Sequence, residues 1–201
     1  MKKLHLLFPL VLLALALCLA ACGSGESDED KIVEVIETSA TSSDPADCEA
    51  LSTQAFLEQT QLSDGKKAVE SCEANAGETK DDPDSVEVSE VEVDGTDATA
   101  EAAFVGGNFD GQTFIVALVE EDGDWKLDRL TGFAEFDQER LGTSFEEELL
   151  SEGESVDKAL AECFGEAVRQ APQKQAEGLI LDGSPQGFVE LINGCAKGQE
   201  A

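Results

Sequence analysis

The sequence predicts an α+β protein in which amino-terminal helices pack on a curved, cone-like sheet of four antiparallel strands, and a small disulfide-stapled helical module follows. The spacing of apolar residues carries this prediction, because it is helical before residue 75, alternates with a period of two between residues 86 and 133, and becomes helical again from residue 141. Cysteines occur in both helical regions, where they can brace each region internally. The fold class follows from the order of these patterns.

The region before the sheet is predicted to be helical. Asp44 suits an N-cap with Pro45 at the first helical position, and the helix that they open is expected to run to about Gln59. A shorter segment over residues 66–74 follows. An earlier helix starts behind an acidic turn, which suits the positive end of a helix dipole. The apolar face of that earlier helix consists of Ile32, Val33, Val35 and Ile36.

Alternation with a period of two begins at residue 86 and predicts the first hairpin. The alternation slips in phase at Ser89 and Glu90, which indicates a β-bulge. Asp94 and Gly95 then form a tight-turn signal, so the chain is expected to return as a second strand over residues 98–105. The apolar positions of the first strand are Val86, Val88, Val91 and Val93.

The second half of the sheet is predicted after a glycine-rich turn at residues 106–111. A strand follows over residues 113–120, and Asp122 with Gly123 turns the chain into a last strand that runs towards Phe133. The third strand alternates most clearly. One of its faces carries Phe114, Val116 and Leu118, and the other carries Ile115, Ala117 and Val119.

The residues after 140 return to helical spacing. A short amphipathic stretch precedes a longer helix that Ala171 and Pro172 stop, and a third segment covers residues 175–181. Ser184 is expected to cap the last helix with Pro185 at its first position. The apolar positions of the first two helices are Phe145, Leu149, Leu150, Val156, Leu160, Cys163, Phe164 and Val168. The last helix is predicted to bury Phe188, Val189, Leu191 and Ile192.

The amino terminus carries a targeting signal. A basic start precedes an apolar run over residues 6–19, which ends in Leu19, Ala20, Ala21 and Cys22. This ending resembles the lipobox of bacterial lipoproteins. A transmembrane helix is the alternative, but the run is shorter than the roughly 20 residues that a bilayer requires, and no stop-transfer pattern follows.

The lipobox resemblance implies cleavage before Cys22, a diacylglyceryl thioether on its sulfur and an acylated amino terminus, with palmitate-type chains. The protein is then expected at the extracytoplasmic face of the cell membrane, a cell-envelope location, with the membrane as its partner through this lipid. Together these predictions divide the chain into four parts. They are residues 1–21 (signal peptide), 22–30 (lipid-anchored flexible tether), 31–140 (cone-like α+β domain) and 141–201 (helical carboxy-terminal module).

Composition excludes several classes of function for the processed chain. The chain has 13 Lys and Arg and 44 Asp and Glu, so cleavage that removes Lys2 and Lys3 leaves 11 basic residues and a formal charge of −33. Such an acidic protein is expected to repel nucleic acid and anionic headgroups. A soluble exterior, a saline environment and a basic partner remain open as reasons for the acidity.

The cysteines predict two disulfides. Cys18 belongs to the signal and Cys22 to the anchor, so four cysteines remain in an exported protein. Four cysteines allow three connectivities, and we favour the sequential one because it closes each helical region internally. The predicted pairs are Cys48 with Cys72 and Cys163 with Cys195. No metal site is predicted, because no CxxC pair and no histidine of the processed chain support one.

Helices followed by a curved sheet that ends in a Gly-Asp-Trp-Lys-Leu element at residues 123–127 resemble the nuclear-transport-factor-2-like superfamily, the fold of ketosteroid isomerases. The resemblance covers residues 28–137. It implies a bent sheet that wraps a helix and leaves an apolar pocket, which members use for catalysis, ligand binding or protein pairing. The isomerase-like members need a tyrosine and the dehydratase-like members a histidine, but this chain has no tyrosine and its one histidine, His5, lies in the signal.

Aromatic residues are the candidates for lining such a pocket. Ordinary core packing is the alternative role for the same rings. The predicted pocket residues are Phe56, Phe104, Phe114, Ala117, Trp125 and Phe133.

The predicted function is therefore non-catalytic. We expect a lipid-anchored envelope protein that binds a hydrophobic small molecule or lipid, or scaffolds an envelope partner, without a cofactor. The alternative is a small isomerase- or dehydratase-like enzyme that uses a solitary carboxylate, with Asp128, Glu135 and Asp137 as candidates.

Overall fold

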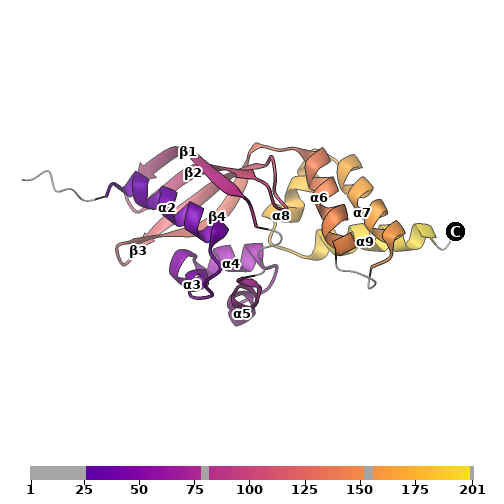
Figure 1. Ribbon diagram of the computed structural model, residues 1–201, viewed down its shortest axis with the longest axis horizontal. Helices are drawn as coiled ribbons and strands as arrows, with labels where there is room; N and C mark the ends of the chain where they lie inside the picture. Colours follow the sequence, from indigo (N-terminus) through magenta and orange to yellow (C-terminus); the bar gives the residue numbers. More distant parts are fainter. Residues whose placement is uncertain (1–25, 78–81, 152–155, 200–201) are drawn as a thin grey trace, which may run out of the picture.

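The computed structural model describes residues 26–77, 82–151 and 156–199. The predicted signal peptide, the lipidation residue Cys22 and the first residues of the predicted tether lie outside these ranges. The described elements follow the predicted order, with helices before and after a sheet (Figure 1). They are α2 (Asp28–Thr41), α3 (Asp47–Leu51), α4 (Gln54–Thr60), α5 (Lys66–Asn75), β1 (Ser85–Asp94), β2 (Asp97–Val105), β3 (Thr113–Glu121), β4 (Asp124–Glu135), α6 (Gln138–Ser151), α7 (Lys158–Gln170), α8 (Gln173–Leu181) and α9 (Gln186–Gln199).

The four strands form an open antiparallel meander in the order β1-β2-β3-β4. The bulge predicted in β1 is confirmed, because the register shifts between Ser89 and Glu92 and Glu90 has a φ of 50°. β4 has 12 residues against 9 in β3, and three register shifts between these strands absorb the difference. Since each irregularity adds twist and bend, the sheet curves.

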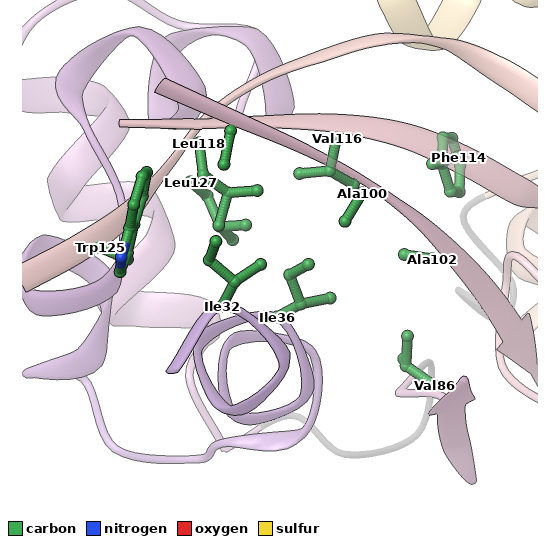
Figure 2. Close-up of a cluster of buried hydrophobic side chains, with 11 residues drawn as sticks. Ile32, Ile36, Val86, Ala100, Ala102, Phe114, Val116, Leu118, Trp125 and Leu127 are labelled. Carbon is green, nitrogen blue, oxygen red and sulfur yellow. The ribbon is translucent and has the colours of Figure 1, made fainter. Parts of the chain in front are cut away.

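Helix α2 covers one face of the sheet and supplies the centre of the core. Ser27 caps the helix by accepting from the Asp30 N–H, and Asp30 reaches back to the Ser27 N–H. Ile32 and Ile36 are buried and point from α2 at the sheet (Figure 2). Their partners on the strands are Val86, Ala98, Ala100, Ala102, Phe114, Val116, Leu118, Trp125 and Leu127.

The single helix predicted from Asp44 to Gln59 is wrong, because the structure forms two short helices, α3 and α4. The break falls at Thr53, whose backbone N–H donates to the Leu127 carbonyl of β4 at 2.8 Å. The Thr53 hydroxyl also caps α4 by accepting from the Phe56 N–H at 3.2 Å. Asp44 is not the N-cap of a long helix, and its carboxylate instead accepts from the Ala46 N–H. At Thr53, the backbone N–H therefore bonds to β4 of the sheet instead of to a carbonyl of the preceding helical turn.

We call helices α6 to α9 the helical region and the elements from α2 to β4 the sheet region. The helical region builds a second core of its own. α6 and α7 cross at two glycines: a Cβ on Gly165 would lie 2.7 Å from the Gly142 carbonyl oxygen, closer than real Cβ contacts. The second core consists of Leu141, Phe145, Phe164, Val168, Ala176 and Leu179. Ser184 and Pro185 stand at the start of α9 as expected, with Ser184 Oγ accepting from the Gln186 N–H.

The predicted buried face of the last helix is wrong in part. Val189 is 51% exposed and Ile192 is 37% exposed, whereas Phe188 and Leu191 are half-buried and Cys195 is buried. The reason is helical geometry, since residue 189 lies about 100° around the helix from residue 188 at 3.6 residues per turn.

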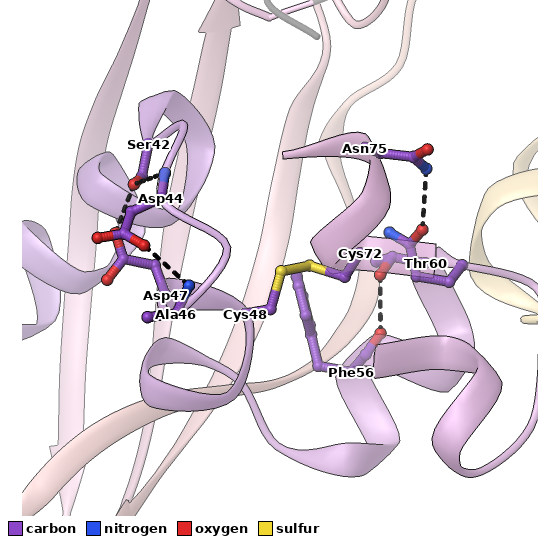
Figure 3. The surroundings of a disulfide bond; sticks show 10 residues. Ser42, Asp44, Ala46, Asp47, Cys48, Phe56, Thr60, Cys72 and Asn75 are labelled. Carbon is purple, nitrogen blue, oxygen red and sulfur yellow. Dashed lines mark hydrogen bonds between the residues drawn. A yellow bond between two sulfur atoms is a disulfide. The ribbon is translucent and has the colours of Figure 1, made fainter. Parts of the chain in front are cut away.

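Both predicted disulfides form. Cys48 is bonded to Cys72, which joins α3 to α5, and Cys163 is bonded to Cys195, which joins α7 to α9. Figure 3 shows the first bond beside the ring of Phe56. Among the described residues, no group of three His, Cys, Asp or Glu side chains is placed to hold a metal ion.

Two glutamines join the regions. Gln112, 1% exposed, exchanges a pair of hydrogen bonds with the backbone of Asp137 directly before α6, at 2.8 and 3.0 Å. Gln59, 6% exposed, donates from its amide to the carbonyls of Leu130 and Leu181 and accepts from the Leu130 N–H. Both side chains reach from the sheet region to backbone near or within the helical region, so they fix how the two regions meet.

Candidate functional site

The first candidate site is a cavity of about 350 Å³ between the sheet and helices α2 to α5, which we call the sheet cavity. Its size lies near the lower end of the range of small-molecule sites. The sheet supplies a buried apolar floor, and α4 supplies Phe56 and Leu57. The strand residues that line it are Ala102, Phe104, Val116, Leu127 and Leu130.

The wall opposite the sheet is held by the Cys48–Cys72 disulfide. Both cysteines line the cavity, and the ring of Phe56 lies beside their sulfurs (Figure 3). Helix α5 itself buries a single residue, Ala68. Because apolar burial contributes so little there, the disulfide keeps α5 in place as a wall, together with hydrogen bonds from α4 to Gly65 at the start of α5.

The rim of the sheet cavity is polar and acidic. Asp44, Asp47 and Asp82 line it, and no described lining residue is Lys or Arg. Ser42 organises part of the rim, because its hydroxyl donates to the Asp47 carboxylate and accepts from the Asp44 N–H at 3.1 Å. Without a basic partner, an anionic group of a ligand would meet only like charge there.

The structure separates the five aromatic residues of the predicted pocket into three groups. Phe56 and Phe104 line the sheet cavity. Phe114 and Trp125 are 1% and 3% exposed and belong to the closed core, where the Trp125 indole donates to Asp28 at 3.4 Å. Phe133 packs against Phe114 and Phe136, with ring centroids 4.6 and 4.7 Å apart. Core packing therefore accounts for more of the aromatic set than a cavity does.

The assignment of Ala117 to the pocket is wrong. Along β3, Phe114, Val116 and Leu118 are buried towards the helices, whereas Ala117 is half-buried on the opposite face of the sheet. The period of two of a strand forces this, because an odd position cannot share the face of its even neighbours.

The three carboxylates considered as a catalytic base do not line the cavity. Asp128 accepts from the Thr53 hydroxyl at 3.0 Å, and Glu135 is exposed at the end of β4. Asp137 caps α6 by accepting from the Arg140 N–H at 3.0 Å, and it pairs with the guanidinium of the same residue. Asp128 and Asp137 thus have structural partners, and none of the three is among the residues that line the sheet cavity.

Two carboxylates elsewhere have a lowered pKa, and neither belongs to a cavity. Hydrogen bonds from Ser27 lower the pKa of Asp30 at the start of α2. Hydrogen bonds from Arg169 and Gln170 lower the pKa of Glu166 on the surface of α7. Both shifts favour the charged form at a helix surface, which is the ordinary behaviour of capping and ion-pairing groups.

A second cavity, of about 470 Å³, lies where the sheet region and the helical region meet, and we call it the junction cavity. Phe109 and Leu130 line both cavities, together with Thr60 and Gln61. Sequence patterns gave no signal for this cavity, because its walls come from α4, β4 and all four described helices of the helical region. The helical region contributes Phe145, Glu148, Leu149, Phe164, Leu179, Ile180, Phe188 and Ile192.

Comparison with protein-family models finds no match for this chain. Searches of curated proteins and of solved structures find none either. The α+β fold therefore rests on the structure itself, and the superfamily and lipoprotein resemblances remain predictions. Within the described parts of the chain, no helix is both long enough and apolar enough to span a bilayer.

Proposed function

We propose that this protein is a non-catalytic, lipid-anchored protein of the cell envelope whose sheet cavity binds an apolar small molecule or a lipid. The observation that carries the proposal is the sheet cavity itself, which combines an apolar floor of Phe104, Val116 and Leu127 with a polar rim open to solvent. A ligand with a hydrocarbon body would bury apolar area at about 25 cal/mol per Å² on that floor. Its polar end would lie at the rim.

The charge of the rim restricts the class of ligand. Because Asp44, Asp47 and Asp82 face the opening without a described basic neighbour in the lining, the polar end should be uncharged or cationic. A free fatty acid or a phosphate-bearing headgroup fits poorly.

The fold supports membership of the nuclear-transport-factor-2-like superfamily as part of this proposal. Its elements match the expected order, with helices, then a bulged meander sheet wrapped on α2. A binding role rather than catalysis is favoured by the residues after Cys22, which include no histidine and no tyrosine. Proton transfer and oxyanion stabilisation in this superfamily usually depend on those groups.

The binding proposal can be tested on protein purified from its own envelope by native mass spectrometry. Ala76→Trp should lower the occupancy of a co-purified ligand at least 10-fold, because Ala76 lines the cavity and is half-buried. Ala74→Trp is the matched control, since Ala74 is exposed on α5 outside the lining. Equal occupancy in both variants, or no ligand in the parent protein, would contradict the proposal.

The anchor is tested separately. Cys22→Ser should release the protein from the membrane fraction or leave it unprocessed, because the thioether lipid has no sulfur to attach to. Fractionation followed by mass determination of the amino-terminal peptide measures this. Unchanged membrane association that still requires detergent would show that another feature holds the protein there.

A further inference from the structure

The junction cavity is built from aromatic side chains that already pack on one another. The rings of Phe145 and Phe188 are 5.5 Å apart at 75°, and those of Phe145 and Phe164 are 5.9 Å apart at 64°. Phe164 and Phe188 lie nearly parallel at 6.2 Å. Phe145, Phe164 and Leu179 are at most 8% exposed, so they form a fixed floor. The half-buried Leu149 and the 37% exposed Ile192 stand at the opening.

The one buried polar side chain in the described lining offers nothing to a ligand. Gln59 uses its amide N–H groups on the Leu130 and Leu181 carbonyls at 2.9 and 2.8 Å, and its oxygen accepts from the Leu130 N–H at 2.8 Å. At the rim, the Thr60 hydroxyl donates to the Phe56 carbonyl. Apart from Gln61 and Asn108 at the rim, the lining offers a ligand apolar burial and ring contacts, and these are expected to supply most of the binding energy.

Charge narrows the ligand class further. Among the described lining residues, Glu148 is the one with a charged side chain, and none is Lys or Arg. An anionic ligand such as a fatty acid would find no counter-charge. At about 30 Å³ per non-hydrogen atom, the volume that one water takes in the liquid, the cavity would hold roughly 15 such atoms.

We propose that the junction cavity is a second binding site, separate from the sheet cavity, for an uncharged, hydrocarbon-rich small molecule of about this size. Helix α9 forms one wall of this cavity, since it supplies Phe188 and Ile192 and is held to α7 by the Cys163–Cys195 bond. The proposal does not depend on a ligand in the sheet cavity, because floor and opening belong mainly to different elements.

The test is photo-crosslinking of the full protein in its native membrane with a diazirine-bearing naphthalene, followed by digestion and mass spectrometry. Saturable labelling of the α6 and α9 peptides, displaced by excess naphthalene, is expected. Leu149→Trp should reduce that labelling at least 10-fold by filling the opening. Val189→Trp is the matched control, because Val189 is 51% exposed on α9 and does not line the cavity.

Ile192→Trp replaces Leu149→Trp as the filling variant if circular dichroism shows that the Leu149→Trp protein does not fold. Equal labelling in the filled and control variants overturns the proposal, and so does labelling that fails to saturate. Loss of labelling on dilution, together with a dimer in sedimentation, would assign the opening to a second copy and also overturn it. Labelling of α5 peptides, lowered by Ala76→Trp alone, reports the sheet cavity, because α5 lines that cavity and not the junction cavity, so the two proposals fail separately.

Discussion

The sheet region and the helical region each close with a disulfide, yet the bond has a different role in the two. In the sheet region the core lies between α2 and the strands. The Cys48–Cys72 bond attaches α5 to α3, and α5 itself buries only Ala68. In the helical region the bonded helix α9 brings Phe188 against the rings of Phe145 and Phe164. The first bond thus shapes a cavity wall, whereas the second holds a core together.

The largest expected effect comes from removing the second bond. Its 32-residue separation gives about 3–4 kcal/mol in the loop-entropy account. Cys163→Ser with Cys195→Ser should therefore lower the free energy of unfolding by about that amount and remove hydrogen-exchange protection from α7. The matched variant, Cys48→Ser with Cys72→Ser, should keep protection in β2 and β3 but lose ligand from the sheet cavity. If both variants lose hydrogen-exchange protection in the same strands and helices, the two disulfides do not have different roles.

The next prediction tests whether the hydrogen bonds of Gln59 join the sheet region to the helical region. Gln59→Leu leaves the Leu130 N–H and the Leu130 and Leu181 carbonyls without their partner, and each buried unsatisfied group costs about 1–3 kcal/mol. We expect a loss of about 3 kcal/mol, the low end for three such groups, and separate unfolding transitions for the two regions by calorimetry. Gln54→Leu is the control, because the Gln54 amide donates at an exposed position of α4, to Glu58 and the Gly65 carbonyl, and not to the helical region. A single transition with unchanged midpoint would show that the regions are joined by other contacts.

A smaller effect is expected where α6 and α7 cross in the helical region. Gly165→Ala places a Cβ 2.7 Å from the Gly142 carbonyl oxygen, so α6 and α7 must separate. Overpacking of this kind costs about 1–3 kcal/mol. Gly194→Ala is the control, because nothing lies within 4 Å of its Cβ position. Chemical denaturation measures both, and a Gly165→Ala variant as stable as the control would refute the close crossing.

The smallest effect concerns the enzyme alternative. Asp128→Asn keeps an oxygen that can accept from the Thr53 hydroxyl, so stability should change by less than about 1 kcal/mol. Cellular function should be retained, as it should for Glu135→Gln and Asp137→Asn. Complete loss of function in one of these amide variants, with unchanged thermal stability, would favour catalysis over binding.

Local patterns were sufficient to predict the strands, the turns and the bulge. Alternation placed β1 to β4 and the phase slip at Ser89 and Glu90, because side chains of a strand alternate whatever surrounds them. Cysteine spacing was enough for the pairing of Cys48 with Cys72, because a bond within each helical region closes the shorter loops.

Neither cavity was predictable residue by residue. Of the predicted pocket residues, Phe56 and Phe104 line the sheet cavity, whereas Phe114 and Trp125 lie in the closed core. An apolar ring has the same sequence signature in a core and in a pocket wall. Only the positions of neighbouring elements decide between the two.

By itself, the sequence determined the order of elements, the acidic charge and the two cysteine pairs, since these depend on composition and on neighbours a few residues apart. Tertiary structure decided the break at Thr53, the Gly142 and Gly165 crossing and the junction cavity. Each of these results from contacts between elements distant in sequence. A hydrogen bond from Thr53 to Leu127 competes with helix formation only when β4 is in place, and short-range spacing contains no record of that contact.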